Sequence, residues 1–285
     1  MRRLLLLLLP LLLLLSSCVP GPPSTVPLAF TESGVGPVVV LLHGHPETAA
    51  SWRAVVPRLA RRYRVLVVDQ RGQGASPAPA DGYDARTRAR DVAALLRRLS
   101  VTRASVVGTD LGGQTAYALA HDDPGLVSRL AVLEAVVPGT RAAAGPLAAP
   151  HIARFTGVDA QVRSTLGRED AHVRGFVCAG RDPCPYPPDL LVEAGEALRR
   201  PGHLRGAFAP YTELLAPFRS PGRLPGSVPV LAVGGGDGVG LLPEQSLREV
   251  ADNVRGVVLP GASHWLAEEQ PQALLAALEP FLAGR

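Results

Sequence analysis

The sequence predicts an α/β fold, with a mostly parallel sheet, helices on both faces and an inserted helical lid. Strand-like runs alternate with helical runs along most of the chain, and the strand-like runs are continuously apolar rather than alternating. Continuously apolar strands are expected where helices cover both faces of a parallel sheet. The alternation stops over residues 138–225 and then resumes, so we expect a helical lid inserted between two halves of one sheet.

The individual elements follow from hydrophobic periodicity and from the Gly and Pro residues that separate the runs. We predict strands at residues 38–43, 65–69, 104–109, 130–136, 228–235 and 254–261. We predict helices at residues 51–62, 84–99, 112–121 and 271–282. Folding is expected to begin near Leu28, so the core comprises residues 28–137 and 226–285, and the lid comprises residues 138–225.

The composition is that of a folded globular chain. With 285 residues, 47% of them hydrophobic, the chain can form one large domain or one domain with an insertion. Its formal charge of +4 comes entirely from arginine, and the arginines are scattered among acidic residues without a basic tract. This scatter argues against a nucleic-acid partner, because nucleic-acid surfaces concentrate positive charge. We expect a small, apolar molecule as the partner instead.

The N-terminus has the pattern of an export signal. Two arginines precede an apolar run from Leu4 to Leu15, which Ser16, Ser17 and Cys18 follow. This run is too short to span a bilayer, which needs about 20 apolar residues in a helix. The segment 15–18 also resembles the bacterial lipoprotein box, which implies cleavage after residue 17, lipidation of Cys18 and a proline-rich tether over residues 18–27. We therefore expect an exported protein anchored in the cell envelope, with an ordinary secretory peptide as the alternative.

Two further cysteines, Cys178 and Cys184, form an even pair in a chain that is expected to be exported. Oxidising compartments favour disulfides, so we predict a short-loop disulfide between them, with two unpaired thiols as the alternative. No histidine or further cysteine flanks them at metal-ligand spacing, so the sequence predicts no metal site there. No cofactor is expected.

The clearest chemical signal is the segment Gly108-Thr109-Asp110-Leu111-Gly112-Gly113, in which an apolar strand runs directly into a helix. This pattern predicts a nucleophile elbow, whose glycines permit a tight turn that lifts residue 110 above the sheet. The usual serine is replaced by Asp110. A carboxylate suits attack at an sp³ carbon and leaves a covalent ester. The alternative is an aspartate that only caps the helix.

Two other segments are expected at the same edge of the sheet. The turn His43-Gly44-His45-Pro46 follows the first strong strand, so the backbone N–H groups of His45 and Leu111 could together form an oxyanion hole. His264 follows the last strand and is the candidate base that activates water. A structural salt bridge between Asp69 and Arg71 is expected to hold the intervening loop.

The segments HGHPETAASW, DQRGQGAS, GTDLGG and SHWLAEEQP, in this order and spacing, resemble the α/β-hydrolases of the epoxide hydrolase and haloalkane dehalogenase group. The resemblance covers roughly residues 28–285 and implies the α/β-hydrolase fold. It further implies an aspartyl ester that a histidine-activated water hydrolyses, without metal or organic cofactor. Members of this group open epoxides to diols or cleave carbon–halogen bonds.

The resemblance also implies an acid that orients His264 and a lid tyrosine that protonates the departing epoxide oxygen. Two residues qualify as the acid: Asp237, at the position typical of epoxide hydrolases, and Glu134, at the position used by several dehalogenases. We favour Asp237. Tyr211 matches the lid tyrosine. A second tyrosine is not evident, and the candidates for its role are Tyr186, His151 and His172.

Leu111 bears on the choice between epoxide and halide. Dehalogenases of this group resemble one another in placing tryptophan or arginine directly after the nucleophile, and the side chain of leucine cannot bind halide. We therefore expect a hydrolase that opens an epoxide. The alternatives are a haloalkane or haloacid dehalogenase, another hydrolase on the same scaffold, and a surface binding module without catalytic activity.

Overall fold

A seven-stranded sheet forms the centre of the computed structural model, which describes residues 24–215 and 222–285. The strand order is β1-β3-β2-β4-β5-β6-β7, and β1 alone runs antiparallel to its neighbour, so the predicted mostly parallel sheet is confirmed. The strands are β1 (Phe30–Ser33), β2 (Val38–Leu42), β3 (Arg64–Val68), β4 (Ala104–Thr109), β5 (Val127–Leu133), β6 (Val230–Gly235) and β7 (Val254–Leu259). The edge strand β1 was not predicted, because it is short and not fully buried.

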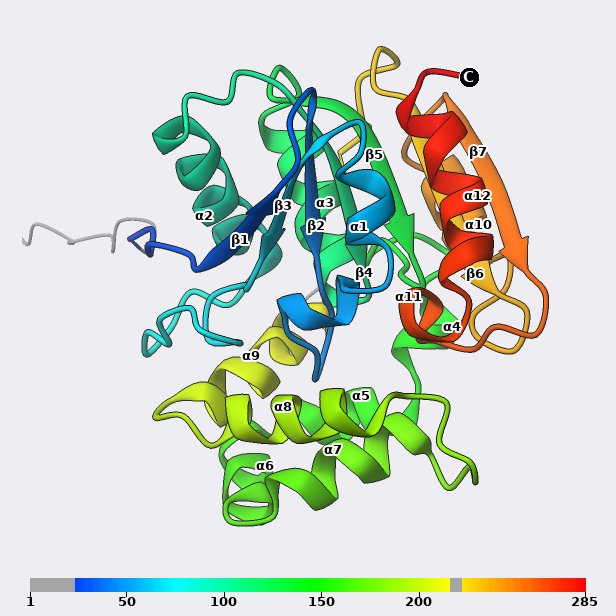
Figure 1. Ribbon diagram of the computed structural model, residues 1–285. Coiled ribbons are helices and arrows are strands. Elements are labelled where there is room, and N and C mark those ends of the chain that lie inside the picture. The colour runs from blue at the N-terminus through cyan, green and yellow to red at the C-terminus, as the bar shows by residue number, and fades with distance from the viewer. Residues whose placement is uncertain (1–23, 216–221) are drawn as a thin grey trace, which may run out of the picture.

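Helices cover both faces of this sheet (Figure 1). One face packs against α2 (Ala85–Arg98), α3 (Leu111–Asp122) and α10 (Leu242–Arg248). The other packs against α1 (Val56–Leu59), α11 (Leu266–Glu269) and α12 (Pro271–Leu282). The single helix predicted at 51–62 is wrong: the segment divides into a 3-10 turn, η1 (Ala49–Trp52), and the short α1. Pro57 lies at the start of α1 and has no N–H to continue a helix from the preceding turn.

In the described part of the segment between β5 and β6, which omits residues 216–221, there are six helices, and we call residues 144–215 the helical insertion. They are α4 (Ala144–Leu147), α5 (Pro150–Phe155), α6 (Val158–Thr165), α7 (Glu169–Cys178), α8 (Pro188–Leu198) and α9 (His203–Leu215). Figure 1 shows α5 to α8 as a separate layer beyond the sheet, on the side toward which the arrows of β5 and β7 point. The insertion has its own apolar core, which also reaches Leu111 and Trp265 of the sheet layer. No helix within the described ranges is long and apolar enough to cross a membrane.

The structure joins Cys178 and Cys184 in a disulfide, with 4.8 Å between their Cα atoms. Cys178 is the last residue of α7, so the bond closes the loop that follows this helix. The predicted signal peptide over residues 1–17 and the predicted lipidation site, Cys18, lie outside the described residues.

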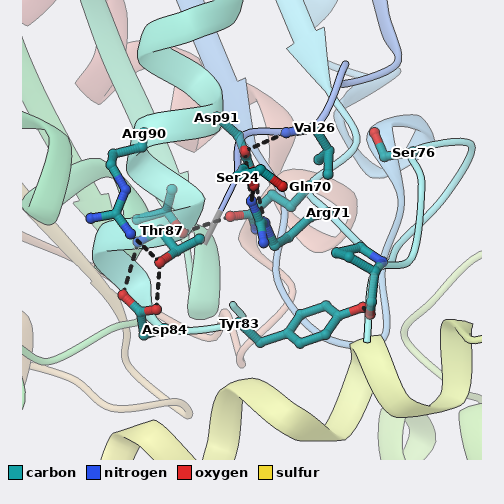
Figure 2. A network of polar contacts seen from close by, with 12 residues as sticks. Ser24, Val26, Gln70, Arg71, Ser76, Tyr83, Asp84, Thr87, Arg90 and Asp91 are labelled. Carbon is teal, nitrogen blue, oxygen red and sulfur yellow. Dashed lines mark hydrogen bonds and ion pairs between the residues drawn. The ribbon is translucent and has the colours of Figure 1, made fainter. Parts of the chain in front are cut away.

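The loop after β3 is held differently from the prediction. Arg71 does not pair with Asp69; its guanidinium makes two hydrogen bonds, of 2.5 and 2.7 Å, to the carboxylate of Asp91 on α2, and both side chains are buried (Figure 2). Asp69 instead accepts backbone N–H groups of Ala49 and Ala75, at 2.7 and 2.9 Å. The carboxylate of Asp69 caps two neighbouring turns. The partner of Arg71 is Asp91 on α2, and no local sequence pattern reveals this pairing.

The same ion pair fixes the start of the described chain. Asp91 accepts the N–H of Val26 at 2.9 Å, and Arg71 donates to the carbonyl oxygen of Ser24 at 3.1 Å (Figure 2). The segment that leaves the predicted tether is therefore attached to α2 and to the loop after β3.

Candidate active site

Asp110 lies at the turn between β4 and α3. Its backbone has a φ of +50° and a ψ of −122°, a conformation that a non-glycine residue rarely adopts and that marks a strained turn. Gly108 and Gly112 allow this turn, since a Cβ on Gly108 would lie 2.2 Å from the carbonyl oxygen of Gly112. The geometry is that of a nucleophile elbow, with a carboxylate where the motif usually carries serine.

Two backbone N–H groups point at this carboxylate. The N–H of His45 donates to Asp110 Oδ1 at 3.1 Å. The N–H of Leu111 also acts on the carboxylate and contributes to lowering its pKa. The structure therefore brings together the two donors that the sequence predicts for an oxyanion hole. The turn carrying His45 has a cis peptide bond before Pro46, and Glu47 Oε2 accepts the N–H of Gly44 at 2.9 Å.

His264 lies between two carboxylates. Its Nε2 atom is 3.6 Å from Asp110 Oδ2, and its Nδ1 atom is 2.9 Å from Glu134 Oε2. The side chain of Glu134 is fully buried, and its other oxygen accepts the N–H of Gly235 at 2.6 Å. These three residues follow β4, β5 and β7, whose carboxyl ends meet at one edge of the sheet.

The structure pairs His264 with Glu134 and not with Asp237, contrary to the preference drawn from the sequence. Asp237 is exposed, and its backbone N–H donates to the carbonyl oxygen of Ala262 at 2.9 Å. The chain leaves β6 through a run of glycines, and Asp237 lies exposed at the wall of the cavity next to His264, without a described side-chain hydrogen bond to its ring. Glu134 is the first residue after β5, so its side chain is directed across the strand end without an intervening loop.

The charges of the site stabilise one another. Burial alone would raise the pKa of Asp110, but the imidazolium of His264 and the N–H groups of Leu111 and His45 lower it to about 2. Burial alone would lower the pKa of His264, but Asp110 and Glu134 raise it to about 10. At neutral pH the site therefore holds a carboxylate beside an imidazolium ion.

A cavity of about 1350 Å³ lies against these residues. Its wall includes Asp110, Glu134 and His264 from the sheet layer, and His151 and His172 from the helical insertion. The volume exceeds the roughly 300–1,000 Å³ that is usual for a ligand pocket. Side chains from both layers therefore line a partly open space that can hold a sizeable ligand next to the carboxylate of Asp110.

Tyr211 and His172 both lie beside the ring of His45. The ring centroid of His45 lies 5.5 Å from that of Tyr211 and 5.6 Å from that of His172. Tyr211 is buried, and burial together with the charge of Asp110 raises its pKa well above the usual value for tyrosine, so the hydroxyl keeps its proton. Tyr186 lies elsewhere: its ring packs against Trp265, and its hydroxyl is near Glu268.

Three charged residues near the site were not singled out from the sequence. Arg88 on α2 is buried and donates to the carbonyl oxygen of Leu111 at 2.9 Å, and no described carboxylate lies within ion-pair distance of it. Glu47 and Glu268 interact in a buried position, where burial raises the pKa of Glu47 to about 7. Of these three residues, only Glu47 could have been linked to the site from the sequence, because it directly follows the predicted turn at 43–46.

Among residues 24–215 and 222–285, no group of three or more His, Cys, Asp or Glu side chains could hold a metal ion. The acid, base and backbone donors described above belong to the chain itself. They can perform nucleophilic attack by a carboxylate, stabilise an oxyanion and activate water.

Comparison with known proteins agrees with this geometry. A family model described as alpha/beta hydrolase fold matches residues 37–271. The chain belongs to this family of hydrolases. This hydrolase is 31% identical over 272 residues to a soluble epoxide hydrolase of Corynebacterium sp. (strain C12), which covers 89% of this chain and 93% of the relative.

A solved structure of the epoxide hydrolase CorEH matches the hydrolase with a TM-score of 0.81 and 30% identity, over 92% of this chain and 98% of that chain. Over 108 residues the hydrolase is 40% identical to a fluoroacetate dehalogenase of Burkholderia sp., which amounts to 36% of each chain. Its relatives therefore include both epoxide hydrolases and a dehalogenase.

Proposed function

We propose that this hydrolase opens an epoxide to a vicinal diol through a covalent ester on Asp110. The observation that carries the proposal is the placement of one carboxylate at an elbow, with an oxyanion hole on one side and a histidine–glutamate pair on the other. Similarity to epoxide hydrolases over nine-tenths of the chain supports it.

In the first step, Asp110 attacks a carbon of the epoxide ring. Oδ1 accepts the N–H of His45, so Oδ2 forms the new oxygen–carbon bond. The ring carbon–oxygen bond breaks, and its electron pair remains on the departing oxygen, which is too basic to leave without a proton. We assign the proton to Tyr211, which flanks His45 and is close enough to Asp110 for that charge to act on it, and we assign a stabilising hydrogen bond to the neutral ring of His172.

The second step hydrolyses the ester. Ester formation removes the negative charge of Asp110, and the pKa of His264 falls because one of the two carboxylates that raised it is gone. The imidazolium then gives up its proton, which passes by way of solvent to the lid tyrosine and replaces the proton taken by the epoxide oxygen. Neutral His264 takes a proton from water, and the hydroxide oxygen attacks the ester carbonyl carbon. The N–H groups of His45 and Leu111 stabilise the oxyanion. On its collapse the bond between the acyl carbon and the substrate oxygen breaks, the imidazolium of His264 protonates that oxygen to release the diol, and the new carboxylic acid of Asp110 returns a proton to His264.

The lack of an indole donor disfavours halide as the leaving group. Leu111 follows the nucleophile, and neither tryptophan offers a free N–H in the wall of the large cavity. The N–H of Trp265 donates to the carbonyl oxygen of Val177 at 3.1 Å. Trp52 is fully buried and is not part of the wall of the large cavity.

The residues in the wall of the cavity also indicate which kind of substrate fits. Apolar residues such as Ile152, Phe176 and Leu214 alternate with three arginines of the helical insertion, Arg154, Arg168 and Arg181. No described acidic side chain lies within ion-pair distance of Arg154 or Arg168. We therefore favour a bulky apolar epoxide, and we expect a carboxylate on it to improve binding.

The deciding experiment is a single turnover of the full-length protein with an aryl epoxide in oxygen-18 water. The first-turnover diol should carry an unlabelled oxygen from the enzyme, and mass analysis should find the label in the Asp110 peptide. The Asp110→Asn variant should give neither product nor label. A labelled diol with an unlabelled Asp110 peptide would contradict the ester. If no epoxide reacts, halide release from haloacids would identify a dehalogenase.

We also propose that the protein is exported and anchored through a lipid on Cys18. The pattern of residues 1–18 supports this. Metabolic labelling with palmitate tests it: the wild type should incorporate label and sediment with membranes, and the Cys18→Ser variant should not. Label in the variant would overturn the assignment.

A further inference from the structure

His45 and His172 face each other through the same ring atom. Their Nε2 atoms lie 3.3 Å apart, the distance of a hydrogen bond. His45 is fully buried, on the turn after β2, and His172 lies on α7 of the helical insertion. The contact therefore joins the sheet layer to the insertion directly beside the nucleophile.

Both rings are neutral at physiological pH. Burial, and secondarily the neighbouring His172, lowers the pKa of His45 well below its ordinary value. Burial and Arg154 lower the pKa of His172 to about 4. A neutral imidazole carries one N–H and one bare nitrogen. One of the two facing Nε2 atoms must therefore carry a proton and donate the hydrogen bond, and the other must accept this hydrogen bond.

The surroundings of His45 determine which ring donates. Its Nδ1 atom is buried and has no hydrogen-bond partner among the described residues. A buried N–H without an acceptor is less well tolerated than a bare nitrogen without a donor. The proton of His45 is therefore on Nε2, so His45 donates to His172, whose Nε2 is the acceptor.

This arrangement leaves His172 with its proton on Nδ1. In the described part of the chain the ring makes no other hydrogen bond, and His172 lines the cavity that contains Asp110. Phe176 and Phe208 pack against the ring, at 6.3 and 5.2 Å between centroids, and restrict its rotation. The Nδ1–H is thus the donor left for a ligand in the cavity.

We infer that His45 is a positioning residue: its side chain donates to His172 Nε2 and thereby holds His172 in the tautomer whose Nδ1–H meets the departing epoxide oxygen. The inference rests on the proposed function for its role in the reaction, but the tautomer itself does not depend on any substrate. The nitrogen that carries the proton on a histidine is commonly set by the hydrogen bond of the other ring nitrogen. The backbone N–H of His45 stabilises the oxyanion, and its ring positions His172.

The tautomer is tested first, by nitrogen-15 spectroscopy of the full-length protein labelled at histidine. His45 should show a protonated Nε2 and a bare Nδ1, and His172 the reverse. Across pH 6 to 8 neither ring should titrate. The opposite pair of tautomers would overturn the inference, whether or not the protein turns over an epoxide.

Three variants test the role in the reaction. His45→Phe keeps the aromatic volume and the backbone N–H but removes the donor, so ester formation should slow by about tenfold, less than the roughly 10²-fold or more expected for loss of a general acid itself. Hydrolysis of the ester should be unchanged. His45→Gln supplies a side-chain N–H and should restore most of the rate. In a His172→Phe background, His45→Phe should cost less than about twofold more, because the two residues act as a unit.

Circular dichroism establishes that the variants fold. If His45→Phe does not fold, the comparison of His45→Gln with His172→Phe and the wild-type nitrogen-15 spectrum still decide the matter. A double variant whose loss equals the sum of the two single losses, in free energy, would contradict the inference. A failure of all epoxides to react, together with the expected tautomers, would instead point to the proposed substrate as the error.

Discussion

Glu134 Oε2 lies 2.9 Å from His264 Nδ1, although 130 positions separate the two residues in the chain. Because the carboxylate is fully buried and also accepts the N–H of Gly235, it has one orientation, and it fixes the orientation of the imidazole in turn. The opposite ring nitrogen of His264 then faces Asp110.

Glu134→Gln should slow ester hydrolysis far more than ester formation. The amide keeps the shape but removes the charge that stabilises the imidazolium, a change that costs on the order of 10⁴-fold in a comparable triad. Rapid-quench measurement of the ester on Asp110 separates the two steps. The matched variant Asp237→Asn should leave hydrolysis within about threefold, because its exposed side chain has no contact with His264. If Asp237→Asn slowed hydrolysis more than Glu134→Gln does, Asp237 would be the acid that orients His264.

His264→Gln should trap the covalent intermediate. Without the base, water is no longer activated, and hydrolysis should slow by about 10²-fold or more, while Asp110 can still attack. The intact variant should gain the mass of one substrate, and peptide mapping should place that mass on Asp110. An absence of adduct, with the fold retained, would argue against an ester on this residue.

Stability should fall in alkali through His264. Its pKa in the folded protein is raised to about 10, so the stabilisation is complete below the unfolded value near 6.5 and is lost as the pH rises through 10. The lowered pKa of Asp110 describes the same ion pair and acts at the acid end, through about pH 2. Between pH 6 and 10.5 the wild type should lose on the order of 2 kcal/mol or more relative to His264→Gln in urea unfolding. A constant difference would contradict this.

Asp91→Asn should destabilise the protein strongly, because it leaves the buried guanidinium of Arg71 without a counter-charge (Figure 2). Removing one partner of a buried ion pair costs about 3–5 kcal/mol. The exposed pair of Arg97 and Asp123 provides a matched control, and Asp123→Asn should cost less than about 1 kcal/mol. Urea unfolding at pH 7 measures both. Equal losses would show that burial of the first pair has no energetic consequence.

Much of the fold and the position of Asp110 at the elbow could be predicted because the signals are local. The apolar runs before Asp110 and His264 end in glycine-containing turns, and that pattern alone places both residues at strand ends. Helix 51–62 failed because a single proline, Pro57, outweighed an otherwise helical pattern.

The sequence by itself determined that a carboxylate replaces serine at the elbow and that parallel strands bring this elbow and His264 to one edge. These properties depend on residue type and on the order of neighbouring residues. The tertiary structure decided which acid faces His264, which residue pairs with Arg71 and which histidine meets His45. Each of these depends on the angle at which a side chain leaves its strand or helix and on contacts between segments distant in the chain, neither of which residue spacing encodes.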